Sequence, residues 1–251
     1  MADERYAEFT EETPKSYLQN LFEESSTQKH KLGTLRTLSD GRQFVYARAG
    51  AANIAAGYLC CAETEEAANL SDWAITANAA VGARTLAVTV GDLAAAIVAN
   101  EFNEGYIYED LANAANSCAY KIKSHPAFAA NASGNIEIYD KVRSALTTSL
   151  TLSAVHNPHR AVIIHPSPPL NTLIGVTAMP ITANYYGWFQ KRGPAPVTIT
   201  GTVVVGDEVF PAAVDGSVGP GANGTSEVLA VIGIAMANNA NDCFALIDLK
   251  L

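Results

Sequence analysis

The chain has 251 residues, a formal net charge of −9 and only 16% charged residues, against about 25% in average proteins. An acidic chain with scattered basic residues repels polyanions, so direct binding to DNA or RNA is not expected. No stretch approaches the roughly 18–20 apolar residues of a membrane-spanning helix, and residues 1–10 lack the features of a secretory signal. We therefore expect neither nucleic acid nor a membrane as a partner.

Residues 1–30 differ from the rest of the chain, and we interpret them as an extended N-terminal arm. They are rich in Glu and Lys, and the apolar spacing after Pro14 predicts a short helix at residues 15–24. The apolar side chains of the predicted stripe are Tyr17, Leu18, Leu21 and Phe22. A segment this short cannot bury these four side chains by itself. We therefore expect the arm to lie on another surface, for example that of a neighbouring subunit.

Residues 31–165 are predicted to form a first β-rich region. Ser39-Asp40-Gly41-Arg42 predicts a hairpin turn, because Asp-Gly supplies the positive φ that tight turns require. Strands are predicted at residues 32–38, 43–47, 58–62, 84–90, 106–108, 120–123 and 136–142. Ala-rich residues 51–56 and 93–100 predict short helices, whereas residues 142–152 fit either a helix or a strand.

Residues 166–251 are predicted to form a second β-rich region, although both regions can equally belong to one continuous domain. Strands are predicted at residues 172–178, 185–190, 197–205, 208–214, 228–236 and 243–249, and one more at residues 161–164, at the end of the first region. Hairpin turns are predicted at residues 205–208 and 238–242. Closely spaced strands with few helices indicate a mainly β fold, a β-sandwich or a barrel, with short peripheral helices.

The densest aromatic run is Tyr185-Tyr186-Gly187-Trp188-Phe189. In a strand, Tyr185 and Phe189 face one side while Tyr186 and Trp188 face the other. This pattern favours a core or a subunit interface over a platform on which a sugar stacks. The interface candidates are therefore Tyr17, Leu18, Leu21, Phe22, Tyr185, Tyr186, Trp188 and Phe189.

Three histidines, His156, His159 and His165, are the nearest approach to a metal motif. Pro158 prevents the regular helix that would aim the first two imidazoles at one ion, and no carboxylate follows at helical spacing. A loop or core role is therefore favoured over a metal hydrolase, although metal binding stays open. We predict no catalytic, cofactor-binding or metal-ligating residues, and hence a protein that is not an enzyme.

Two further patterns have structural explanations. Gly219-Pro220-Gly221-Ala222-Asn223-Gly224, followed by Asp242, imitates a dinucleotide fingerprint. The next residues predict a strand instead of the required helix, so a flexible surface loop is favoured. The four cysteines lack a CxxC pair and are predicted to be buried, reduced thiols.

Several stretches together resemble the capsid decoration, or cement, proteins of tailed bacteriophages. The resemblance is carried by residues 27–34, 39–47, 55–60 and 182–190, by Gly193-Pro194-Ala195 leading into a predicted hairpin at residues 203–214, and by residues 232–237. It spans most of the chain from residue 27 and consists of strands and turns without a catalytic signature.

The resemblance implies a homotrimer on the outer surface of the virion capsid that braces contacts between subunits of the major capsid protein. It carries no catalytic residues, and such a protein is made in the host cytoplasm. The acidic charge agrees with a position away from packaged DNA. The alternative is a head-fibre, tail or receptor-binding virion component that binds carbohydrate through the aromatic run.

Overall fold

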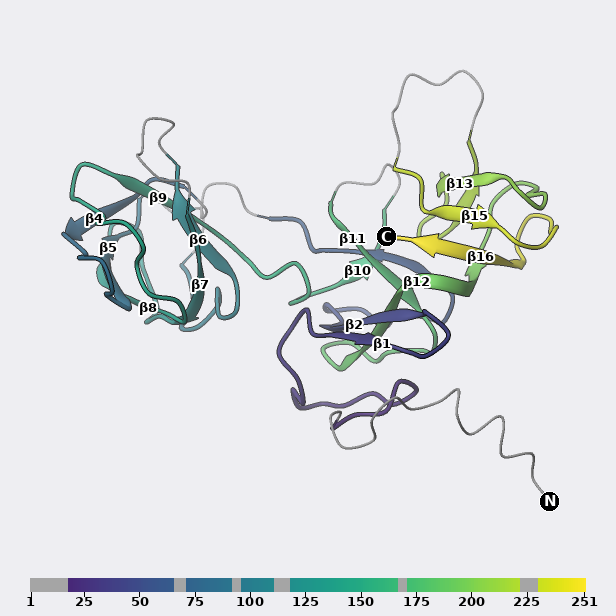
Figure 1. Ribbon diagram of the computed structural model, residues 1–251, viewed down its shortest axis with the longest axis horizontal. Coiled ribbons are helices and arrows are strands. Elements are labelled where there is room, and N and C mark those ends of the chain that lie inside the picture. The colour runs from purple at the N-terminus through teal and green to yellow at the C-terminus, as the bar shows by residue number, and fades with distance from the viewer. Residues whose placement is uncertain (1–17, 66–70, 92–95, 111–117, 167–170, 222–229) are drawn as a thin grey trace. The chain divides into compact units, whose positions relative to one another are not determined.

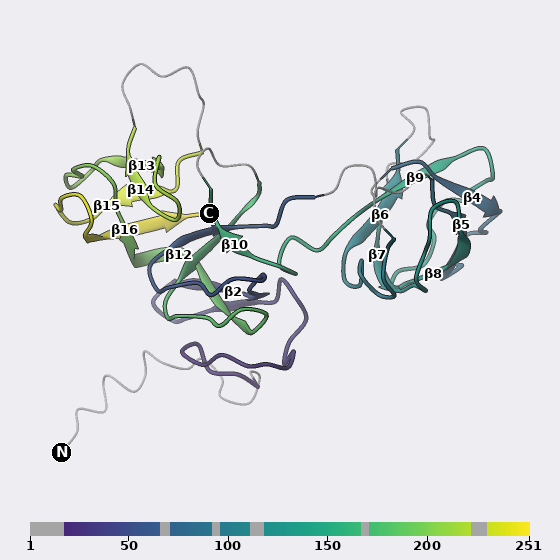
Figure 2. The ribbon, with the colours of Figure 1, turned by 180° about the vertical axis from the view of Figure 1, so that it is seen from behind.

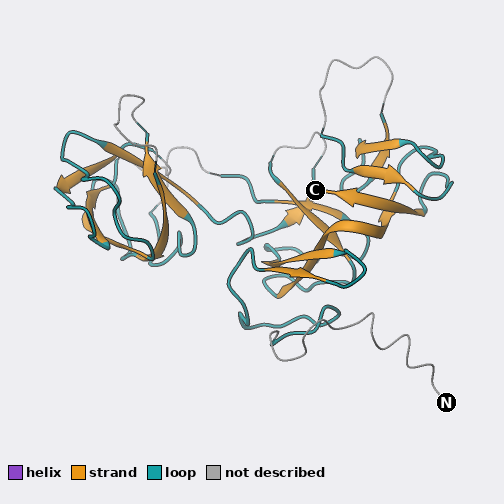
Figure 3. Ribbon diagram, in the orientation of Figure 1, coloured by secondary structure: helices purple, strands orange, loops and turns teal. Residues whose placement is uncertain are grey.

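The computed structural model describes residues 18–65, 71–91, 96–110, 118–166, 171–221 and 230–251 (Figure 1). Every regular element among these residues is a β-strand (Figure 3). The predicted mainly β fold is therefore confirmed. The predicted helix at residues 51–56 is wrong, because Ile54 pairs with Ile181 in an isolated bridge. The described parts of the other predicted helices, residues 18–24 and 96–100, are likewise not helical.

Residue contacts divide the chain into two compact units, which are described separately. Unit 1 comprises Met1–Thr64 and Pro158–Leu251, and unit 2 comprises Glu65–Asn157. This division differs from the consecutive regions expected at residues 31–165 and 166–251. Sequence patterns mark strands but not their partners, so they do not reveal where one unit is inserted into another.

The insertion point lies between two strands of unit 1 that pair with each other. Strand β3 (Leu59–Cys61) precedes unit 2 and β10 (Ile163–Ile164) follows it, and they are antiparallel neighbours. The chain thus leaves and re-enters unit 1 at adjacent strands, as a hairpin does.

Unit 1 contains one large antiparallel sheet (Figures 1 and 2). The strand order is β10-β3-β11-β12-β16-β15-β13-β14, with β2 also paired to β12 and β1 paired to β2. The remaining strands are β1 (Leu35–Thr37), β2 (Gln43–Arg48), β11 (Leu173–Thr177), β12 (Tyr186–Thr198), β13 (Glu208–Pro211), β14 (Val218–Pro220), β15 (Gly233–Ala235) and β16 (Phe244–Lys250).

Strand β12 organises this sheet. The predicted strand at residues 185–190 continues through the Gly-Pro-Ala-Pro stretch to Thr198, because two prolines are compatible with extended backbone. Its first half pairs with β2 and its second half with β16, so Arg192 is opposite both Gln43 and Lys250. The predicted aromatic alternation is confirmed, since Trp188 joins the core cluster of Tyr46 whereas Phe189 joins that of Val45.

Two of the three predicted hairpin turns join paired strands. Gly41 has a φ of 87° between β1 and β2, and residues 238–242 connect the paired strands β15 and β16. The turn at residues 205–208 is present, but its flanks do not pair with each other. Strand β13 pairs with β14 and β15, while Val203 bridges Asn239, so the predicted hairpin at residues 203–214 is wrong.

The start of the Gly219–Gly224 pattern was also misassigned. Val218–Pro220 forms β14, which is paired with β13, so this part is a strand and not a loop. Residues 222–224 lie outside the described residues.

Unit 2 is a closed antiparallel barrel of order β4-β5-β8-β7-β6-β9. Its strands are β4 (Trp73–Ala77), β5 (Thr85–Thr89), β6 (Tyr106–Glu109), β7 (Ala119–Ser124), β8 (Ser133–Ile138) and β9 (Thr151–Val155). Trp73, Phe102 and Phe128 are fully buried at its centre. Ile136 and Ile138 point inward while Glu137 is exposed, in the period-two pattern of a barrel strand.

Candidate functional site

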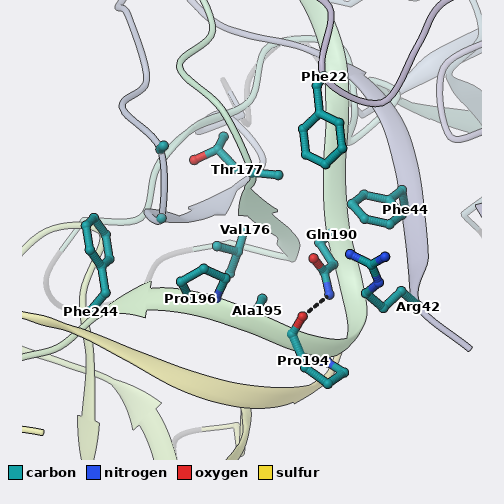
Figure 4. A pocket seen from close by; sticks show the side chains of 13 residues that line it. Phe22, Arg42, Phe44, Val176, Thr177, Gln190, Pro194, Ala195, Pro196 and Phe244 are labelled. Atoms are coloured by element: carbon teal, nitrogen blue, oxygen red, sulfur yellow. Dashed lines mark hydrogen bonds between the residues drawn. The ribbon is translucent and has the colours of Figure 1, made fainter. Parts of the chain in front are cut away.

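A cavity of about 280 Å³ opens on unit 1 (Figure 4). Its walls come from residues in or next to β2, β11, β12 and β16, from residues 56–57 and from Phe22. The lining residues are Phe22, Arg42, Phe44, Ala56, Gly57, Val176, Thr177, Ala178, Gln190, Pro194, Ala195, Pro196 and Phe244. The surface that a ligand would meet is therefore largely apolar.

Phe22 and Phe244 stand at two sides of this cavity (Figure 4). Their exposed fractions are 63% and 53%, whereas Phe44, which also lines the cavity, is buried. Gly57 has a φ of 78°, and a Cβ there would lie 2.3 Å from the Phe244 ring. The glycine thus provides both the left-handed backbone and the space in which the Phe244 ring lies.

The polar groups of the cavity are engaged in holding the backbone. The Gln190 amide Nε2 donates to the carbonyl oxygens of Arg192, Gly193 and Pro194 at 3.1, 3.2 and 2.9 Å. The Arg42 Nε lies 2.6 Å from Asp40 Oδ2. The Gln190 hydrogen bonds stabilise β12 where its pairing with β2 shifts register, between Gln190 and Arg192. Apolar contact is therefore the main chemistry that the cavity offers.

The apolar surface continues from the cavity onto the outer face of β12, β16 and β15. Pro196 is opposite Leu246 in the register, and the Met236 N–H donates to the Leu246 carbonyl on the other side. Leu246 and Met236 are 38% and 46% exposed. We call Phe22, Pro196, Met236, Phe244 and Leu246 the apolar face. A contiguous exposed apolar surface of this kind is typical of an interaction site.

The predicted interface candidates are distributed differently from this face. Leu21, Trp188 and Phe189 are buried within unit 1, and Tyr185 and Tyr186 are half-buried. Leu18 and Phe22 are exposed, and only Phe22 lines the cavity. Tyr17 lies outside the described residues.

Sequence reasoning missed Met236, Phe244 and Leu246. A signal was present, because residues 244–247 are all apolar and a strand points alternate residues to opposite faces. Since Ala245 and Ile247 occupy the core, Phe244 and Leu246 must face outward.

Residues 18–30, which we call the strap, lie on the sheet of their own unit. Gln19 is buried, its Oε1 accepts from the Tyr46 hydroxyl at 2.8 Å, and its Nε2 donates to the Tyr186 carbonyl at 2.9 Å. Ser25 bridges Tyr186, and the Trp188 Nε1 donates to the Gln19 carbonyl at 3.3 Å. The described part of the predicted arm therefore covers the aromatic run of its own chain.

The three histidines have separate partners. His165 is buried with its ring nitrogens 2.9 and 2.8 Å from the carbonyl oxygens of Pro166 and Ser217, and the His159 ring lies against Gly33. His156 belongs to unit 2, where its Nδ1 lies 2.5 Å from Glu65 Oε2. Among the described residues, no group of three or more His, Cys, Asp or Glu is arranged to hold a metal ion.

The cysteines differ in exposure. Cys60 and Cys61 are buried, and burial raises the pKa of the Cys61 thiol to about 11. Cys243 is exposed, so the prediction of buried thiols is wrong for that residue, which lies in the β15–β16 turn.

Another buried histidine predicts acid sensitivity of unit 2. Burial lowers the pKa of His125, and the nearby His156 lowers it further, while Glu101 opposes the shift. The Nε2 atom of His125 accepts a hydrogen bond from the Phe102 N–H at 3.0 Å. The unfolded chain binds a proton near the ordinary pKa of 6.5, but the folded unit resists it. Stability of unit 2 is therefore complete above pH 6.5 and falls as the pH drops below this value.

Urea unfolding of a Trp188→Phe variant, followed by Trp73 emission, measures this effect at about pH 7.5 and about pH 5.5. We expect a smaller free energy of unfolding at the lower pH, and a reduced pH dependence when His125→Gln is added. Equal pH dependence with and without His125→Gln would contradict the prediction.

Comparison with protein-family models, with curated proteins and with solved structures finds no match for this chain. No described residue lies in a helix that is long and apolar enough to cross a membrane.

Proposed function

We propose that this chain is a non-enzymatic structural protein that binds other protein subunits through the apolar face of unit 1. The observation that carries the proposal is the position of Phe244 and Leu246, which expose large apolar side chains beside a preformed cavity. Burial of such side chains stabilises a protein–protein contact by about 25 cal/mol per Å² of apolar area removed from water.

We further propose that the partner is the major capsid protein of a tailed phage and that the chain decorates the outside of the shell as a homotrimer. The resemblance of its sequence pattern to decoration proteins supports this choice, apart from the predicted hairpin at residues 203–214, which is not formed. Repetition over many symmetric copies makes a modest contact per chain effective against pressure from packaged DNA. The acidic charge of −9 suits an outward position.

Co-sedimentation with assembled shells of the cognate major capsid protein tests this function. We expect Leu246→Glu to weaken binding about tenfold or more, because it places a charge in the centre of the contact. Val81→Glu is the matched control, since Val81 is 66% exposed but belongs to unit 2. Wild-type chain that does not bind shells, or equal binding by both variants, contradicts the proposal.

Carbohydrate binding through the aromatic run has less support. A stacking platform requires an accessible ring face. Trp188 is 1% exposed beneath the strap, and Phe189 is fully buried. Carbohydrate stacking on Trp188 or Phe189 is therefore disfavoured, and only Tyr185 and Tyr186 of the run are half-buried.

A further inference from the structure

Basic side chains gather beside the cavity although acidic residues outnumber basic ones by 25 to 16. Arg42 lines the cavity but is ion-paired with Asp40 at 2.6 Å, and Arg192 lies on β12 between the lining residues Gln190 and Pro194. Lys250 is directly opposite Arg192 on β16, and both are exposed. Asp248, opposite Pro194, lies on the same face of β16 as Lys250. Arg192 and Lys250 repel each other and outnumber this one acidic side chain, so this end of the apolar face favours an anionic occupant.

The edge of β12 that faces away from β16, at residues 194–198, is unsuited to the addition of a strand. Thr198 N–H donates to the carbonyl of Gly57, a residue that lines the cavity. Alternate residues of a strand direct their backbone groups to the same side, so Pro194 and Pro196 present their nitrogens toward that side. Because proline has no N–H, an occupant must enter with side chains and not by extending the sheet.

Residues 1–17 have the matching chemistry. They contain the aromatic residues Tyr6, Phe9 and Tyr17, and their charged side chains are Asp3, Glu4, Glu8, Glu11 and Glu12 against Arg5 and Lys15, a net of 2 − 5 = −3. Their attachment is also close to the cavity. Leu18 is four residues from Phe22, which lines the cavity, so their Cα atoms are at most about 14 Å apart.

We propose that residues 1–17 occupy the cavity of their own chain, with Phe9 supplying apolar contact to its lining and the acidic side chains attracted to Arg192 and Lys250. Attachment through a short connection gives the segment a high effective concentration, which favours its own chain over a neighbour. This inference rests on the proposed function, because the cavity belongs to the same apolar face. Residues 1–17 compete with the shell for that face, and shell binding displaces them.

A fluorescent peptide of residues 1–17 tests the docking by anisotropy, without any shell. We expect it to bind the chain lacking residues 1–17 and the full chain carrying Phe9→Ala, and to bind the wild-type full chain at least tenfold more weakly. Failure to bind either variant, or equal binding to the wild-type chain, overturns the proposal. A mass that rises with concentration only when residues 1–17 are present also overturns it, because the segment would then occupy a second copy.

Charge variants of the full-length Phe9→Ala chain separate specific docking from nonspecific attraction. Arg192→Glu combined with Lys250→Glu is expected to weaken peptide binding tenfold or more, whereas Lys141→Glu, an exposed lysine of unit 2, leaves it unchanged. Equal effects of the two changes contradict the proposal. Peptide binding without shell binding would refute the proposed function alone, and shell binding without peptide binding would refute this inference alone.

Discussion

Replacing Trp188 with alanine is expected to lower the free energy of unfolding of unit 1 by about 3–5 kcal/mol, the usual cost of truncating a buried aromatic residue. Trp188 is 1% exposed and packs against Tyr46, with ring centroids 5.1 Å apart. Its Nε1 also donates to the Gln19 carbonyl, so the change removes a cross-link between β12 and the strap. We therefore expect the strap to become susceptible to proteases at the same time.

Hydrogen exchange measured by mass spectrometry tests this prediction, because it reports each unit separately. Amides of β2 and β12 should exchange faster in Trp188→Ala, while those of the unit 2 barrel should not change. Trp188→Phe retains a ring and is expected to lose less stability, which makes it the matched control. A loss below about 1 kcal/mol, or equal acceleration in both units, would contradict the proposed packing.

The strands of this fold were largely predictable from local pattern. The alternation of Ile136, Glu137 and Ile138 and that of Trp188 and Phe189 was confirmed, because side-chain direction in a strand follows from geometry alone. The Asp40-Gly41 turn was predictable for a similar reason, since few residues accept its positive φ.

The pairing of strands was not predictable in the same way. Residues 203–214 have the pattern of a hairpin, yet Val203 pairs with Asn239 and β13 with β14 and β15. The choice between such partners depends on tertiary packing, which a single sequence does not encode locally. The Ala-rich stretch at residues 51–56 failed as a helix for the same reason, because the isolated bridge at Ile54 fixes it as extended chain.

The candidate site was only partly predictable. The sequence singled out aromatic density, and dense aromatic residues proved to be mostly core, as for Trp188 and Phe189. Phe22 was identified, but its place across the cavity from Phe244 (Figure 4) depends on segments that are distant in the sequence. Such a cavity exists only once β2, β11 and β12 are assembled.

Deleting residues 65–157 removes all of unit 2 and is nevertheless expected to leave unit 1 folded. Strands β3 and β10 are direct neighbours without the insert, and Glu63 forms an ion pair with Arg160 at 2.6 Å beside the junction. A short turn joining Thr64 to Pro158 should therefore close the gap. Unit 1 has its own core clusters, so its unfolding free energy, followed by Trp188 emission, should change by less than about 1 kcal/mol.

The complementary fragment, Glu65–Asn157, is expected to fold alone as a closed barrel. Its ends are held together by the Glu65–His156 pair at 2.5 Å, and its strands leave no open edge. Trp73 emission and a cooperative urea transition like that of the full chain would verify this expectation. An unfolded fragment would contradict this expectation, because it would show that unit 2 requires the rest of the chain to fold.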